Sequence, residues 1–248
     1  ASTLDDRPAI VVGGQSLTYA ELDAAARRCA AAFLDMGATG VVYFGANDLS
    51  FPVAVFASAY ADLPFIPLNY RLGEEQLEPL VEANRGAVLV SEGSDLPGAD
   101  PSMLVLRERL LDPTFRAAND VELPGFVDPE EIAIVLYTSG TSGVPKAALL
   151  RHRHLTSYII GTVEFAGAEE DQAALVTVPP YHIAGIANLL SNVFAGRRIV
   201  YLETFDAVTW LDTIRGEGVT QAMVVPTMLA RVVHHLDGAP ADTPTLRT

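Results

Sequence analysis

The chain has 248 residues, 50% of them hydrophobic and 19% charged, which predicts a globular protein with a sizeable core. Its 31 acidic and 16 basic residues give a net charge of −15, which argues against nucleic-acid binding. The single cysteine, Cys29, excludes an intramolecular disulfide, no cluster of side chains has metal-ligand spacing, and no signal peptide or membrane-spanning stretch is visible, so we expect a soluble cytoplasmic protein.

Helix and strand signals alternate along the first half of the chain. Hydrophobic periodicity and helix-start residues predict helices over residues 18–37, 50–60 and 74–84. Short apolar runs predict strands over residues 41–44, 65–68 and 87–91. The stretch 92–128 carries Gly, Pro and scattered charge, and it is the best candidate for a boundary between two lobes, 1–127 and 128–248.

The same alternation continues after this stretch. Strands are predicted over residues 132–137, 174–178, 199–202 and 222–225, and helices over 154–163, 183–194, 207–215 and 226–236. Alternating strands and helices are typical of an α/β fold with largely parallel sheets and right-handed crossovers.

Residues 137–146, with the sequence YTSGTSGVPK, hold the strongest chemical signal in the chain. They follow a strand-like run, and glycines there allow consecutive backbone N–H groups to converge on an anion while hydroxyls add donors. Lysine supplies a mobile positive charge for a phosphate. We therefore predict a phosphate-binding loop made of Thr138, Ser139, Gly140, Thr141, Ser142, Gly143 and Lys146.

The distribution of charge supports this prediction independently. Residues 132–163 contain no Asp or Glu, although the chain has 31 carboxylates. Lys146 lies in this window and is the only lysine, since the other basic residues of the chain are arginines. A strongly acidic protein that keeps one stretch free of carboxylates favours an anion at that stretch. The alternative is a solvated connection of Ser and Gly with no ligand.

Three better-known signatures are absent. A Walker loop needs Gly-Lys-Ser/Thr, but Pro145 precedes the lysine and Ala147 follows it. No Gly-x-Gly-x-x-Gly follows a strand, and Gly-x-Ser-x-Gly does not occur, so neither a dinucleotide fold nor an α/β-hydrolase is indicated.

Residues 137–146 resemble the phosphate-loop signature of the adenylate-forming superfamily, which includes acyl- and aryl-CoA synthetases, luciferases and peptide-synthetase adenylation domains. Further segments are similar to that family in the same order: PFIPLN at 64–69, HRHL at 152–155, PPYHIAG at 179–185 and VPTML at 225–229. The sequence departs from the family at Ala147, where glycine is usual.

The resemblance implies the N-terminal domain fold of these enzymes over residues 1–248, in an incomplete form. The family's adenine and ribose contacts, magnesium-linked glutamate, hinge and catalytic C-terminal lysine come from later segments. We therefore expect no catalytic residue within the chain, an absent C-terminal domain, and a fragment that is inactive alone.

The family places its carboxylate substrate beside the PPYHIAG segment, which assigns substrate binding to Tyr181, His182 and Gly185. Members that activate amino acids carry an aspartate where this chain has His182, because a buried ammonium needs a counter-ion. No acid occurs between Asp171 and Glu203, so an acid without an α-amine is expected, such as a fatty or aromatic acid. The alternative for His182 is a hydrogen-bonded core histidine.

The implied reaction is ATP-dependent activation of a carboxylic acid, most simply a fatty acid, to an acyl-adenylate and then to acyl-CoA. ATP and coenzyme A would be the cosubstrates, and magnesium would arrive with ATP. Two alternatives stay open: an adenylation domain that loads a carrier protein, and, if the 248 residues are the complete chain, a non-catalytic nucleotide- or acyl-binding module. The oligomeric state is also open, with a homo-oligomer among the options.

Overall fold

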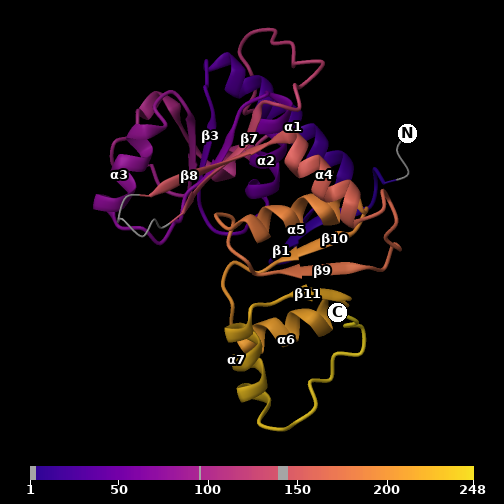
Figure 1. Ribbon diagram of the computed structural model, residues 1–248. Helices are drawn as coiled ribbons and strands as arrows, with labels where there is room; N and C mark the ends of the chain where they lie inside the picture. Colours follow the sequence, from indigo (N-terminus) through magenta and orange to yellow (C-terminus); the bar gives the residue numbers. More distant parts are fainter. Residues whose placement is uncertain (1–3, 95, 139–144) are drawn as a thin grey trace. The chain divides into compact units, whose positions relative to one another are not determined.

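The computed structural model describes residues 4–94, 96–138 and 145–248, which form two compact units (Figure 1). Unit 1 combines Ala1–Ala20, Asn47–Leu49 and Ile159–Thr248, and unit 2 combines Glu21–Ala46 and Ser50–Tyr158. The units interleave along the sequence, so they do not correspond to lobes that meet at residue 127. The stretch 92–128 belongs to unit 2, because it adds a strand to the sheet of that unit.

Unit 2 contains a six-stranded sheet with the order β6-β5-β3-β4-β7-β8. All neighbouring strands are parallel except β7 and β8, which form an antiparallel pair at one edge. The strands are β3 (Val41–Phe44), β4 (Phe65–Pro67), β5 (Val88–Ser91), β6 (Leu104–Leu106), β7 (Ile132–Thr138) and β8 (Lys146–Arg151).

The helices of unit 2 begin where the sequence signals place them. They are α1 (Tyr19–Asp35), whose first two residues belong to unit 1, α2 (Ser50–Tyr60) and α3 (Glu74–Ala83), with short 3-10 turns η1 (Pro101–Met103) and η2 (Arg107–Leu111). Pro52 lies in the first turn of α2, where a missing N–H leaves no hydrogen bond unmade. Glu74 and Glu75 occupy the first turn of α3, where carboxylates are favoured by the helix dipole.

Unit 1 contains a five-stranded sheet with the order β11-β9-β10-β1-β2, parallel except for the pair β1 and β2. Its strands are β1 (Pro8–Val12), β2 (Gln15–Thr18), β9 (Ala173–Val176), β10 (Arg198–Tyr201) and β11 (Gln221–Met223). Its helices are α5 (Ile183–Phe194), α6 (Ala207–Gly216) and α7 (Pro226–Leu236), and α4 (His152–Thr162) spans the change from unit 2 to unit 1.

The two crossovers of unit 1 run in opposite directions across its sheet. The connection through α5 leads from β9 to β10, whereas the connection through α6 leads from β10 back past β9 to β11. Because parallel crossovers are right-handed, the two helices cover opposite faces of the sheet, as Figure 1 shows. Helices α6 and α7 pack against each other on the second face.

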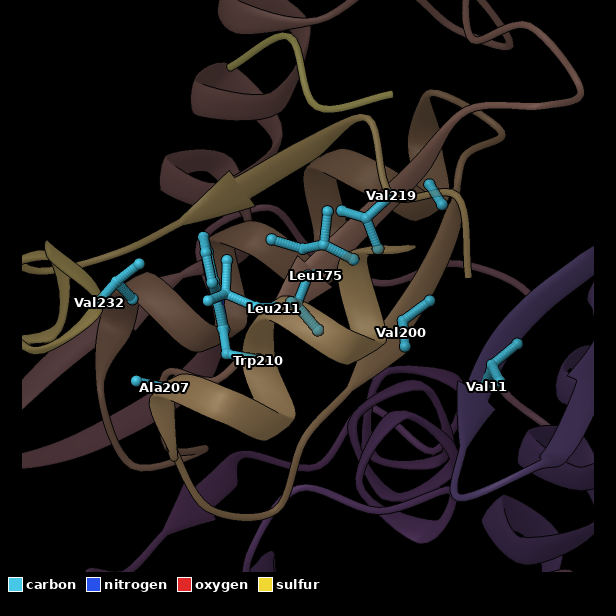
Figure 2. Close-up of a cluster of buried hydrophobic side chains, with 10 residues drawn as sticks. Val11, Leu175, Val200, Ala207, Trp210, Leu211, Val219 and Val232 are labelled. Carbon is cyan, nitrogen blue, oxygen red and sulfur yellow. The ribbon is translucent and has the colours of Figure 1, made fainter. Parts of the chain in front are cut away.

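A cluster of buried side chains joins α6 to this sheet (Figure 2). Trp210 and Leu211 of α6 pack with Leu175 of β9 and Val200 of β10. Trp210 is 5% exposed and is a core residue of unit 1.

The predicted helices and strands are all present, with ends that differ by a few residues. Four strands were not predicted: β1, β2, β6 and β8. β8 is an edge strand whose first four residues are exposed, so its side chains show no burial pattern, and only backbone pairing with β7 makes it a strand. The α/β fold with mostly parallel sheets is confirmed.

Candidate functional site

Two residues of the predicted phosphate loop, Thr138 and Lys146, lie at the end of the β7–β8 hairpin in unit 2. Thr138 is the last residue of β7, Lys146 is the first of β8, and the two are directly paired in the antiparallel register. The Thr138 hydroxyl donates to the Lys146 carbonyl oxygen at 3.3 Å. Ser139, Gly140, Thr141, Ser142 and Gly143 lie outside the described residues.

The place of this hairpin end in the sheet suits a ligand. β7 is parallel to β4, so Thr138 lies at the carboxyl edge of the parallel strands, where open α/β sheets bind their ligands. The preceding residue, Tyr137, fixes the strand end to α3, since its hydroxyl accepts a hydrogen bond from the Asn84 side chain at 2.9 Å. Asn84 also donates to the Leu80 carbonyl oxygen at 2.7 Å, which holds its amide in place.

The positive charges near the hairpin differ in how they are neutralised. Arg153 forms an ion pair with Glu130 at 2.8 Å, and Arg151 approaches the same carboxylate at 3.8 Å. Lys146 is exposed and forms no ion pair with any residue of the described ranges. Lys146 is therefore the cation of residues 145–153 whose charge remains available to an anionic ligand.

Tyr181, His182 and Gly185 come together in unit 1, around the start of α5. His182 is the N-cap residue of α5, and its ring packs on the Tyr181 ring with centroids 4.5 Å apart. His182 is exposed rather than buried, so the core-histidine interpretation does not apply. The loop that carries both rings leaves the carboxyl end of β9, beside the point where the crossovers diverge to opposite faces.

Gly185 is required by the close approach of this loop to α5. A Cβ atom on Gly185 would lie 2.8 Å from the Pro179 carbonyl oxygen and 3.3 Å from that of Val178. Backbone atoms cannot move aside as a side-chain tip would, so only glycine fits here.

Sequence reasoning missed a buried side-chain amide, that of Asn47, which contacts the loop after β9. Asn47 is 1% exposed, and its side-chain amide donates to the Val178 carbonyl oxygen at 3.0 Å. Thr177 and Tyr201 are also buried near the carboxyl ends of β9 and β10. Burial raises the pKa of the Tyr201 hydroxyl, and the Asp48 carboxylate raises it further. No local motif marks Asn47, because its partner is 131 residues away.

Two cavities lie apart from these residues. One of about 390 Å³ in unit 2 is bordered by Asn84, Arg85 and Asp100, and one of about 260 Å³ in unit 1 is bordered by Asn188, Asn192 and Gln221. None of the predicted site residues that the structure describes lines either cavity. Within the described ranges, no group of three or more His, Cys, Asp or Glu side chains could hold a metal ion, and no helix could span a membrane.

Comparison with known proteins gives consistent matches. The family model described as AMP-binding enzyme matches residues 1–248. A feruloyl-CoA synthase of Amycolatopsis sp is 31% identical over 247 residues, which are 95% of this chain and 49% of that protein. The fatty acid–[acyl-carrier-protein] ligase ScoC of Streptomyces coeruleorubidus is 29% identical, over 97% of this chain and 49% of that protein.

Among solved structures, the chain resembles O-succinylbenzoate coenzyme A synthetase of Bacillus subtilis in complex with AMP, with a TM-score of 0.82. The match covers 99% of this chain and 51% of that one, at 22% sequence identity, which establishes a shared fold. The chain thus spans about half the length of the relatives it matches.

Proposed function

Because the chain belongs to the AMP-binding enzyme family, we propose that it is the nucleotide-binding part of a ligase that activates carboxylic acids. In the first step the carboxylate oxygen of the acid attacks the α-phosphorus of ATP, which forms an acyl-adenylate and releases pyrophosphate. In the second step a thiolate attacks the acyl carbon, which forms a thioester and releases AMP. Coenzyme A would supply that thiol.

The observation that carries the proposal is that Lys146 is exposed and its charge is unpaired among the described residues. Its ammonium group is exposed, free of ion pairs with the described residues, and placed at the carboxyl edge of the sheet. This arrangement fits the β- and γ-phosphates of ATP, whose negative charge increases on pyrophosphate as the bond to the α-phosphorus breaks. Thr138 and the hydroxyls and backbone N–H groups of residues 139–143 would add neutral donors.

Magnesium would reach this site bound to the phosphates of ATP. The described residues offer hydroxyl and ammonium groups at the hairpin end and no cluster of metal-binding side chains, so they suit the phosphates better than the ion itself. When bound, the ion would neutralise phosphate charge; the part of Lys146 is to bind and orient the leaving pyrophosphate.

His182 supports an acid without an α-amine. The exposed imidazole and the Tyr181 ring offer no carboxylate to pair with a substrate ammonium, and none occurs between Asp171 and Glu203. A fatty acid is the narrower prediction. The relatives named above act on feruloyl and fatty acyl groups, so they support the acid class without selecting the acyl group.

Two alternatives keep specific support. A carrier protein could replace coenzyme A as the thiol, as the name of ScoC states for that relative. A nucleotide- or acyl-binding module without catalysis is the second alternative. We propose that the residues described here act within a longer protein and that the 248-residue chain alone forms no acyl-CoA.

The test is ATP–pyrophosphate exchange in the complete protein. We expect Lys146→Ala to lower the exchange rate by about 100- to 1,000-fold, the effect of removing one positioned charge-stabilising donor. Arg153→Ala is the matched control, since it removes a positive charge that Glu130 already neutralises, and its exchange rate should change little.

An unchanged exchange rate in Lys146→Ala would refute the phosphate assignment. A panel of acids tests the substrate class in the same assay: fatty and aryl acids should drive exchange, and α-amino acids should not. Exchange driven best by amino acids would show that His182 does not define the class.

A further inference from the structure

The three residues Asn47–Leu49 belong to unit 1 and form a short turn between β3 and α2. The chain leaves β3 at Phe44 and begins α2 at Ser50, both in unit 2, and Asn47–Leu49 join unit 1 between them. The Tyr43 hydroxyl contacts the residues on both sides of this turn. It donates to the Ala46 carbonyl oxygen at 3.0 Å and lies 3.1 Å from the Ser50 hydroxyl. These two contacts therefore fix the conformation of the turn.

Asn47 reaches from this turn to the loop after β9. Its Nδ2 atom donates to the Val178 carbonyl oxygen at 3.0 Å, and the side chain is 1% exposed. Its Oδ1 atom is buried and has no hydrogen-bond partner among the described residues. The hydrogen bond to Val178 is therefore the polar contact through which the Asn47 amide acts on this loop.

Two prolines limit the backbone hydrogen bonds of the loop. Pro179 and Pro180 lack a backbone N–H, so at these two positions only the carbonyl groups can take part in backbone hydrogen bonds. The Pro179 carbonyl accepts from the His182 N–H at 3.1 Å, and the Val178 carbonyl accepts from Asn47. Gly185 lies against both carbonyls, so the Val178 oxygen is confined between the Asn47 amide and the first turn of α5.

We propose that Asn47 is a positioning residue that sets the loop carrying Tyr181 and His182, and thereby the place of the carboxylic acid substrate. This inference rests on the proposed function, in which those two rings border the acid. Asn47 acts through the loop and touches no reacting atom. Loss of its hydrogen bond releases the Val178 carbonyl and lets the two rings shift, which weakens acid binding while the phosphate contacts of Lys146 remain.

The experiment compares Asn47→Ala with the wild type in the complete protein. We expect the KM for the carboxylic acid to rise about tenfold, the loss that one buried hydrogen bond corresponds to, and the KM for ATP to stay within a factor of about two. Hydrogen exchange of the backbone amides in residues 176–187, read by mass spectrometry without substrates, should become faster.

Thr220→Val is the matched control. Thr220 is 4% exposed, and its hydroxyl exchanges hydrogen bonds with Ala173 at the opposite end of β9. This variant also loses a buried hydrogen bond of unit 1, so any general destabilisation should appear in it. Its KM values and the exchange rate of residues 176–187 should match the wild type.

The outcomes separate the two proposals. If acids are activated but Asn47→Ala keeps its acid KM and its exchange rates, the positioning role is wrong and the proposed function stands. If both variants raise the acid KM equally, Asn47 has only a structural role. If no acid is activated by the wild type, the proposed function fails, and the role of Asn47 fails with it.

Discussion

Burial distinguishes the only cysteine of the chain, Cys29, from its only lysine, Lys146. Cys29 is fully buried, and its thiol donates to the Leu110 carbonyl oxygen at 3.4 Å. Desolvation raises the pKa of this thiol to about 12, which keeps it protonated and unreactive. Lys146, in contrast, is exposed on an edge strand. The lysine is therefore available to a ligand and the cysteine is part of the core.

The raised pKa of Cys29 predicts a pH dependence of stability. The pKa of about 12 in the folded protein exceeds the usual thiol pKa of 9.0, so folding favours the protonated thiol. Its contribution is complete below pH 9 and is lost as the pH rises toward 12, by ~1.4 kcal/mol per pH unit. Urea unfolding of the wild type and of Cys29→Ala at pH 8, 10 and 11 measures this contribution to the free energy of unfolding.

The free-energy difference between the two proteins should shrink as the pH rises. Cys29→Ala loses packing by a constant amount at every pH, which serves as the internal baseline. Tyrosine and lysine titrate in both proteins and cancel in the comparison. Two curves that stay parallel from pH 8 to 11 would show that the buried thiol does not couple to folding.

At the scale of elements, the start of α5 depends on a backbone contact rather than on a helix cap. His182 is the N-cap residue but makes no side-chain capping hydrogen bond. Instead, the His182 N–H donates to the Pro179 carbonyl, and Gly185 lets the first turn lie against that carbonyl. The hairpin end shows the same principle, since Thr138 and Lys146 are placed by strand pairing.

Substitution of Gly185 by alanine therefore has a defined cost. The added Cβ would lie 2.8 Å from the Pro179 carbonyl oxygen, so backbone must shift, and we expect a loss of ~1–3 kcal/mol in unfolding free energy. Gly161→Ala is the control, because Gly161 lies in α4 with open space around its Cβ position. There alanine should stabilise the helix by ~0.5–1 kcal/mol.

Denaturant unfolding of Gly185→Ala and Gly161→Ala measures both changes in the free energy of unfolding. Opposite signs at the two glycines are expected, since helix propensity alone would favour alanine at each. Equal stabilisation at both positions would mean that the loop after β9 moves away from α5 at little cost.

At the scale of the whole molecule, each unit has its own sheet and its own buried cluster. The cluster of unit 1 gathers around Trp210 and that of unit 2 around Leu80 and Leu89. The surface, in contrast, carries a large excess of carboxylates, and the net charge of −15 acts on the chain as a whole. Self-repulsion of this kind opposes the compact state.

Salt should therefore stabilise the 248-residue chain near neutral pH. The Debye length falls from about 30 Å at 0.01 M to about 10 Å at 0.1 M, which screens repulsion between distant carboxylates. The exposed ion pairs also weaken, but each contributes little. We expect the urea midpoint to rise with added sodium chloride at pH 7.

The same titration near pH 4.5 provides the control. Carboxylates begin to protonate there, so the net charge falls and the effect of salt should shrink. A urea midpoint that falls with salt at pH 7 would show that ion pairs, rather than the net charge, dominate the electrostatics of the fold.

The sequence by itself determined the features that depend on neighbouring residues. Helix α5, strand β9 and the segment 137–146 each carry their signal within a short window, as apolar spacing or as a run of hydroxyls and glycines. The carboxylate-free window predicts only in part that the charge of Lys146 has no ion-pair partner. Glu130, which lies outside that window, neutralises the nearby Arg153.

Only the tertiary structure decided what depends on partners far away in the sequence. It made residues 146–151 an edge strand, placed the stretch 92–128 in unit 2, and brought Asn47 to Val178 across 131 residues. Local sequence patterns indicate which side chains are buried. The edge strand, the place of residues 92–128 and the Asn47–Val178 contact depend instead on which backbone groups and buried amides form hydrogen bonds with one another. Those partners are selected when strands pair and loops pack against the sheets, because an unpaired buried polar group is costly wherever its partner lies.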